Sequence, residues 1–262
     1  SDAISLVIAF AARKIARKPR DETMTFGYAR VEIVAALINY TSLIIIGLYL
    51  LFEAVMRFFD PQPVAGWLIV IIAGVALVID LVTALLTYSM SKSSMNIRAA
   101  FLHNVADALG SVAVIVAGTL ILLYDWHFID PLVTLMIAGY ILWQSFSEIG
   151  PVIRILMLGS PPETRTKDVL QAVQAVDGVS GVHHAHFWQM TEHRGALDVH
   201  VVVDKGAWDR ADAIKGNIKL MLKDRFGIDH STLELECGFH ACDDSSTFGS
   251  DNPASHDHSH AH

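Results

Sequence analysis

Residues 33–52 read IVAALINYTSLIIIGLYLLF, a run without a single charged side chain. A helix needs about 20 mostly apolar residues to cross a bilayer, so this segment predicts a membrane-spanning helix. Comparable uncharged runs occupy residues 61–79, 108–124 and 131–147. A shorter run at 3–12 resembles the second half of a further membrane helix. It is not a signal peptide, because basic residues follow it instead of preceding it. Together the runs predict helices over residues 1–16, 31–58, 64–90, 98–124 and 129–157.

The distribution of charge orients these helices. Basic residues are concentrated at 13–20 and recur at Lys92 and Arg98, whereas the loops at 60–66 and 125–130 contain neither Lys nor Arg. Basic loops favour the cytoplasmic side, so we expect the C-terminal part in the cytoplasm. The net charge is −8, and the sequence lacks the basic surface signature that nucleic-acid binding requires.

Beyond residue 159 the long apolar runs give way to an ordinary mixed sequence. This part predicts a small α/β domain of αββαβ order. Helical spacing occurs at 164–176 and 207–226, and strand-like runs occur at 184–190, 197–203 and 231–236. We therefore expect a transmembrane domain at 1–158, a cytoplasmic metal-binding domain at 159–242 and a disordered acidic, His-rich tail at 243–262. The tail either collects metal weakly or is a dispensable solvated end.

His103 and Asp107 are the most informative polar residues of the membrane part. They lie four residues apart in a predicted helix, so they share one face, and a charge at that depth costs at least about 2.5 kcal/mol. Imidazole and carboxylate at this spacing can form half of a tetrahedral zinc site; a buried hydrogen-bonded pair is the alternative. Asp2, also among apolar residues, either contributes to the same site or caps a helix.

The segment from Cys237 to Cys242 contains a second set of metal-ligand types. Cys237, His240 and Cys242 have the spacing C-x-x-H-x-C. A structural disulfide is not expected in a cytoplasmic domain, and thiolates with an imidazole suit a soft metal ion. We interpret these three residues as a candidate metal-binding motif.

Several longer motifs occur in a characteristic order. They are TFGYARVEIVAALIN at 25–39, NIRAAFLH at 96–103, DALGS at 107–111, DP at 130–131, HAHFW at 184–188 and DVH at 198–200. Over nearly the whole chain they resemble the zinc-transporting subgroup of the cation diffusion facilitator family. The resemblance implies a homodimer of six-helix subunits that exchanges a metal ion for protons by alternating access. It also implies that the first helix and the front of the second precede residue 1.

The resemblance also implies site residues. Asp2, His103 and Asp107 correspond to three of four transport ligands, and the fourth would lie upstream of Ser1. Mixed His/Asp ligation implies Zn²⁺, with Cd²⁺ often tolerated. In the cytoplasmic domain the resemblance implies a regulatory metal site near the dimer interface; His200 could equally be an ordinary strand-surface residue. The residues of this site would be His184, His200, His230 and Glu236.

Two departures from the family pattern stand out. Some relatives bind a second metal in the loop after the first run with histidines around the Phe-Gly motif, where this chain has Met24 and Tyr28; Asp21 remains, but the site is expected to be lost. The loop at 91–96 is short and not His-rich, which is typical of bacterial members and predicts the bacterial inner membrane. Three further polar residues of the membrane part are expected either to face the transport path or to pair between helices: Asn39, Glu53 and Asp80.

Two other functions compete with transport. An intramembrane metal hydrolase needs a general base beside an open metal position, as in H-E-x-x-H, and that motif is absent from the sequence. A membrane metal sensor would keep the cytoplasmic ligands without needing the pair His103 and Asp107. The sequence therefore predicts a secondary transporter, not an enzyme, with the sensor as the alternative.

Overall fold

The computed structural model describes residues 2–59, 66–92, 94–124, 129–238 and 246–248. The chain divides into two compact units, Ser1–Ile153 and Arg154–His262. The first unit is helical and the second has α/β structure.

The first unit contains long helices that follow the apolar runs of the sequence. Their bounds are α1 (Asp2–Ala16), α2 (Val31–Phe59), α3 (Gly66–Ser91), α4 (Met95–Tyr124) and α5 (Ile129–Leu156). Each of α2 to α5 contains a segment that is long and apolar enough to cross a membrane. Many of their large apolar side chains, such as Leu85, Leu86 and Trp143, remain exposed, as a lipid-facing surface requires. The predicted multi-pass helical domain is confirmed.

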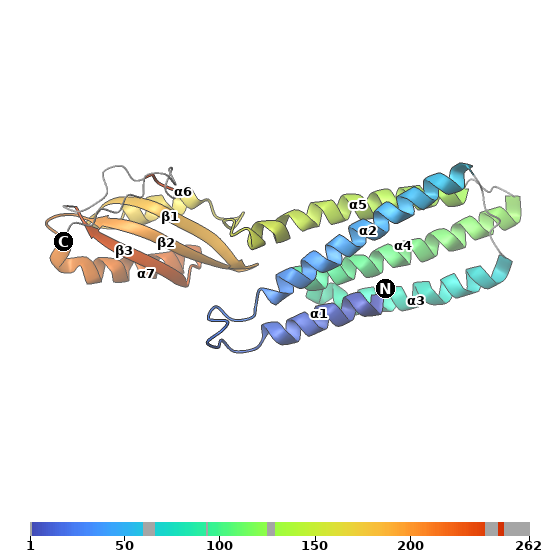
Figure 1. Cartoon of the computed structure of the whole chain (residues 1–262), viewed down its shortest axis with the longest axis horizontal. Helices are drawn as coiled ribbons and strands as arrows, with labels where there is room; N and C mark the ends of the chain where they lie inside the picture. Colours follow the sequence, from blue (N-terminus) through green and yellow to red (C-terminus); the bar gives the residue numbers. More distant parts are fainter. Residues whose placement is uncertain (1, 60–65, 93, 125–128, 239–245, 249–262) are drawn as a thin grey trace. The chain divides into compact units, whose positions relative to one another are not determined.

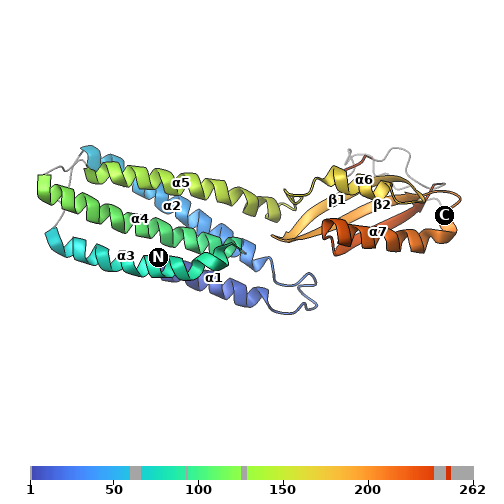
Figure 2. The same cartoon turned by 180° about the vertical axis from the view of Figure 1, so that it is seen from behind.

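Helix α4 is the centre of this unit. It packs against α1, α2 and α3, and the helices run side by side in both views (Figure 1, Figure 2). Its alanines at 99 and 100 are completely buried. Small side chains let membrane helices approach closely, so these positions explain why three neighbours can pack on one helix.

One hydrogen bond fixes the register of α1 on α4. The Asn96 Nδ2 group of α4 donates to the Ala9 carbonyl oxygen of α1 at 2.8 Å, and the two helices run antiparallel (Figure 1). Position 2 precedes Ala9 by seven residues, and His103 follows Asn96 by seven. Both lie about 10 Å from this contact, at 1.5 Å per residue. The start of α1 therefore lies at the level of His103.

The second unit places its helices on one face of a three-stranded sheet. Strand β1 (Val179–Thr191) pairs antiparallel with β2 (Arg194–Val203), and β2 pairs parallel with β3 (His230–Cys237). Helix α6 (Thr166–Gln174) precedes β1; a short 3₁₀ turn (Trp208–Arg210) and α7 (Ala211–Phe226) connect β2 to β3. This order confirms the predicted αββαβ domain.

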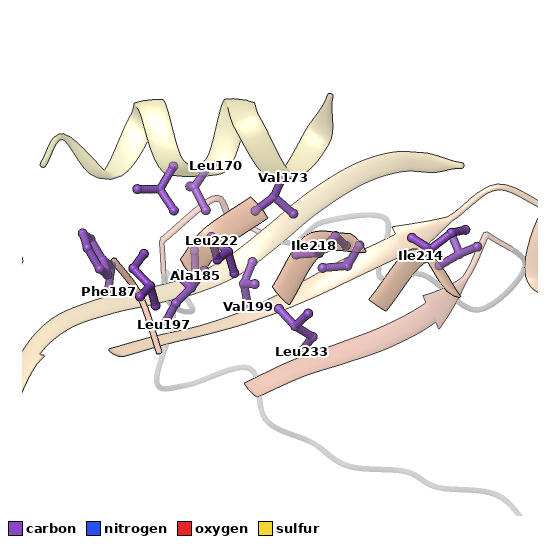
Figure 3. Close-up of a cluster of buried hydrophobic side chains, with 14 of the residues drawn as sticks. Leu170, Val173, Ala185, Phe187, Leu197, Val199, Ile214, Ile218, Leu222 and Leu233 are labelled. Carbon is purple, nitrogen blue, oxygen red and sulfur yellow. The ribbon is translucent and has the colours of Figure 1, made fainter. Parts of the chain in front are cut away.

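The core of this unit lies between the helices and the sheet. Alternate residues of β2, from Leu197 to Val203, are fully buried, and they pack with Leu222 of α7 and Val173 of α6 (Figure 3). Successive strand residues point to opposite faces. The intervening residues, which include Asp198 and His200, therefore lie on the face that carries no helix.

A β-bulge in β1 adds histidines to this helix-free face. His183 pairs with His200 and His186 with Asp198, so two residues of β1 oppose Val199 alone. His184 adopts a left-handed conformation with φ 51°, the backbone state found at one common kind of bulge. The extra residue shifts the alternation: Ala185 joins the core, while the residues on both sides of the bulge turn to the helix-free face.

Candidate metal centres

The first candidate centre is the pair predicted on α4. His103 is only 2% exposed, and its Nε2 atom lies 3.4 Å from Asp107 Oδ2. Two ligands bound at about 2.0–2.1 Å in tetrahedral geometry lie roughly 3.3 Å apart, which follows from zinc bond lengths. The two atoms therefore have the separation that a shared zinc ion requires.

Helix α1 brings a further candidate to this centre. Its buried positions include Ser5, Ala9 and Ala12, a stripe with the three- and four-residue spacing of one helix face. Position 2 continues this stripe by one turn, and the register on α4 puts it at the level of His103. The side chain of Asp2 lies outside the described part, so its ligand role stays a prediction.

The other polar residues of the membrane part fall into different environments. Glu53 forms an ion pair with Arg57 at 2.5 Å along α2. Asn39 is buried on α2. Asp80 is buried on α3 and accepts a hydrogen bond from Ser111 Oγ of α4 at 3.4 Å. Of these residues, Asp80 is therefore the one with a described contact to the helix that holds His103 and Asp107.

The second candidate centre lies on the helix-free face of the sheet. One ligand atom from each of His183, His200 and Glu236 falls within 4.8 Å of the others. Glu236 Oε1 lies 2.6 Å from His200 Nδ1, and Glu236 Oε2 lies 3.3 Å from His183 Nε2. These three residues from three strands are called the sheet cluster below.

A metal ion fits the sheet cluster. His183 Nε2 and Glu236 Oε2 are buried and make no hydrogen bond within the described residues. Their 3.3 Å separation again matches an edge of a zinc tetrahedron. Buried polar atoms are nearly always paired in native proteins, so an ion between the two atoms would satisfy both.

Two more histidines surround the sheet cluster. The His184 ring lies 4.9 Å from that of His200 and 5.2 Å from that of His186, between centroids. Burial lowers the pKa of His184, and the positive charges that its histidine neighbours would carry lower it further. A lowered pKa keeps the imidazole neutral near pH 7, which is the form that binds metal.

The remaining ligands predicted for this domain lie elsewhere or outside the described residues. His230 begins β3 opposite Ala196, whereas Glu236 stands opposite Val202 near the other end of the strand. The structure thus brings His183, and not His230, to Glu236. Cys237 is a free, half-buried cysteine. His240, Cys242 and, of the tail predicted at 243–262, residues 243–245 and 249–262 lie outside the described part.

The loop between α1 and α2 has its own hydrogen-bond network. Asp21 accepts hydrogen bonds from the Tyr28 hydroxyl at 2.5 Å and from the amide groups of Thr23 and Met24. These bonds, that of Tyr28 first, lower the pKa of Asp21 to about 2. The Asp21 carboxylate is therefore engaged by the residues that replace histidines in this loop.

The helices are long enough to cross a membrane and carry an imidazole–carboxylate pair, and the second unit carries another metal-compatible cluster. These features define a multi-pass membrane protein that handles metal ions. The comparisons with known proteins agree. Residues 1–157 match the model of the cation efflux transmembrane domain, and residues 161–237 match ZT_dimer, the cytoplasmic domain of cation efflux proteins. The chain belongs to the cation efflux family, which confirms the resemblance in the sequence.

Similar proteins are known from several bacteria. The cadmium, cobalt and zinc/H(+)-K(+) antiporter of Bacillus velezensis is 35% identical, over 98% of this chain and 84% of its own. The metal cation efflux system protein CzcD of Cupriavidus metallidurans is 32% identical (90% and 74%), and the zinc transporter ZitB of Pectobacterium atrosepticum is 32% identical (93% and 75%). The metal-bound C-terminal domain of the Cupriavidus CzcD transporter is 33% identical, covers 28% of this chain and 99% of its own, and has a TM-score of 0.26, too low to support a structural argument.

Family membership fixes the general activity. The chain is a divalent metal cation efflux transporter of the membrane, with a cytoplasmic domain, and not an enzyme. The ZT_dimer match also suggests that it dimerises.

Proposed function

We propose that the chain exports Zn²⁺ in exchange for H⁺ by alternating access, as a homodimer in the bacterial inner membrane. The observation that carries the proposal is the pair on α4, in which Nε2 of the buried His103 and Oδ2 of Asp107 are 3.4 Å apart. This pair supplies two ligands of a tetrahedral site, and Asp2 supplies a third from α1. The antiporter and zinc transporter names of the relatives add support.

The ligand types favour zinc as the main cargo. Imidazole nitrogen with carboxylate oxygen suits a borderline ion such as Zn²⁺, whereas an all-oxygen site would suit Mn²⁺ or Mg²⁺. Cadmium and cobalt appear in the name of the Bacillus velezensis relative. We therefore propose Cd²⁺ and Co²⁺ as secondary cargoes that compete with zinc at the same atoms.

Proton coupling follows from the chemistry of the ligands. Metal binding needs a neutral His103 and ionised carboxylates, so an arriving zinc ion displaces protons. When the site opens to the outer face, protons compete for the same lone pairs and the ion is released. Exchange needs no separate proton channel, because proton and metal occupy the same atoms in turn.

We propose the sheet cluster as a regulatory metal site, with His184 and Glu234 beside it. Glu234 Oε2 lies 3.2 Å from His200 Nε2, so this ring is contacted by a carboxylate at each nitrogen. Carboxylates hold metal-binding imidazoles in position and raise their basicity. Zinc bound here would order the domain when the cytoplasmic zinc concentration rises.

The proposal is tested with the full-length protein in liposomes under an imposed pH gradient. We expect gradient-dependent zinc uptake by the unmodified protein, and a loss of at least about a hundredfold in Asp107→Ala, because a transport ligand is removed. Glu53→Gln is the matched control: it also removes a carboxylate from a membrane helix, but one that is paired with Arg57. Uptake that persists in Asp107→Ala would place the ion path elsewhere, and zinc binding without uptake by either protein would favour the sensor.

A further inference from the structure

Asp80 is a buried carboxylate of the membrane part that the proposed site does not use. It is 5% exposed on α3 and accepts a hydrogen bond from Ser111 Oγ on α4 at 3.4 Å. Carboxylates inside membrane helices are costly, and they typically mark ion paths or proton relays. A charged carboxylate at this depth is costly even when it accepts hydrogen bonds, so the position calls for a functional explanation.

The register of α3 on α4 places Asp80 close to the transport pair. The rings of Tyr88 and Phe101 are in contact, with centroids 5.8 Å apart, and Asp80 contacts Ser111 further along, so the two helices are antiparallel. Ser111 follows Asp107 by four residues, one helical turn or about 6 Å. The carboxylate of α3 therefore lies about one turn beyond Asp107.

The direction of this step is outward. After Leu156 at the end of α5 the chain continues into the cytoplasmic domain, so the last turn of α5 lies at the cytoplasmic side. Helix α4 runs antiparallel to α5 (Figure 1), so α4 begins at the same side, at Met95. Moving from Asp107 to Ser111 therefore moves away from the cytoplasm. A cation released outward from the transport pair meets the level of Asp80 next.

A second observation concerns Asn104, a polar residue on the α3-facing side of α4. Asn104 is fully buried at 0% exposure, and neither its Oδ1 nor its Nδ2 atom makes a hydrogen bond within the described residues. It precedes Ser111 by seven residues, two helical turns, and so shares its face. A buried amide without a partner is unfavourable, which indicates a ligand or hydrated ion that passes along this face.

We propose that Asp80 is a further carboxylate of the transport path, which binds the divalent cation between its release from His103 and Asp107 and its exit at the outer face. The inference rests on the proposed function. Asn104 lines the path one turn before Asp107. An oxygen-only position holds zinc less tightly than a site with imidazole, as a release step requires.

The test compares zinc transport rates of full-length variants in liposomes with equilibrium zinc binding to the purified proteins. Asp80→Asn keeps the shape of the side chain and removes its charge. We expect its maximal rate to fall at least tenfold while the transport pair still binds zinc. Asp80→Glu should recover part of the rate. Ser111→Ala should keep most of the rate, because it leaves the Asp80 carboxylate in place. If Asp80 acted only through its hydrogen bond with Ser111, the two substitutions would lower the rate equally.

Asn104→Leu provides an independent arm. Replacing an unpaired buried amide by an apolar side chain of similar size should leave the unfolding temperature unchanged or higher, while the maximal rate falls at least threefold. The inference is overturned if Asp80→Asn transports zinc at the rate of the unmodified protein. If Asp80→Asn does not fold, the same result in Asn104→Leu overturns it. Asp107→Ala is measured in parallel: if it abolishes transport and Asp80→Asn does not, this inference alone fails, whereas an unmodified protein that moves no zinc refutes the proposed function.

Discussion

Exchanging one histidine of the cytoplasmic domain should distinguish the ligand set of the structure from that of the sequence. The resemblance selects His230 as a ligand, whereas the geometry selects His183, whose Nε2 lies 3.3 Å from Glu236 Oε2. We expect His183→Ala to weaken zinc binding by this domain. His230→Ala is the matched control, because it removes the same side chain from β3 at a position opposite Ala196, remote from Glu236 along the strand.

The expected loss of zinc affinity follows from the removal of one ligand. His183 supplies one of three ligand atoms that lie within 4.8 Å of one another. Loss of an outer-shell partner lowers metal affinity 10–100-fold, and loss of a direct ligand should cost at least as much, about 1.4–2.7 kcal/mol. In this variant the Glu236 carboxylate, whose side chain is only 14% exposed, keeps His200 as a histidine partner but loses His183.

Competition with a fluorescent zinc chelator measures this affinity in the full-length protein. Both variants are made in an Asp107→Ala background, so that the transport pair does not contribute to the signal. The reasoning predicts a weakened His183→Ala and an unchanged His230→Ala. Equal losses in both, or a loss in His230→Ala alone, would refute the sheet cluster as the metal site.

Three further outcomes are expected. Leu222→Ala, which empties a fully buried position of the cytoplasmic core, should lower the free energy of unfolding by about 2–5 kcal/mol in chemical denaturation. Tyr28→Phe removes the main cause of the pKa of about 2 at Asp21, so an NMR titration should find that pKa raised towards 3.8. Because the pKa of His184 is lowered in the fold, the unfolded chain binds protons more readily; the metal-free protein should lose stability as pH falls from about 7.5 to 5.5, measured as the midpoint of thermal unfolding.

The membrane helices could be predicted from the sequence because their signal is local. Uncharged runs of membrane length predicted helices at 31–58 and 129–157, and the structure has α2 at Val31–Phe59 and α5 at Ile129–Leu156. The pair on α4 was predictable for the same reason, since i and i+4 share a face of any helix. What α3 places beside this pair depends on packing between helices, which spacing within one helix does not encode.

The residues of the sheet cluster could be predicted only in part from the sequence. The predicted strand at 184–190 is longer in the structure, where β1 spans Val179–Thr191, and strict alternation would put His183 and His186 on opposite faces. The bulge at His184 reverses the alternation and brings both to one face. A signal was present, because apolar Val182 and Ala185 are three residues apart and Phe187 follows after two, a break in period that indicates a bulge.

The most direct test of proton-coupled zinc export measures both fluxes at once. Liposomes with the full-length protein, without a pH gradient, receive a zinc gradient directed inward while internal zinc and internal pH are recorded with separate dyes. The account predicts that zinc entry drives protons out, so that internal pH rises in step with zinc, and that both signals vanish in Asp107→Ala. Zinc entry at an unchanged internal pH would contradict it.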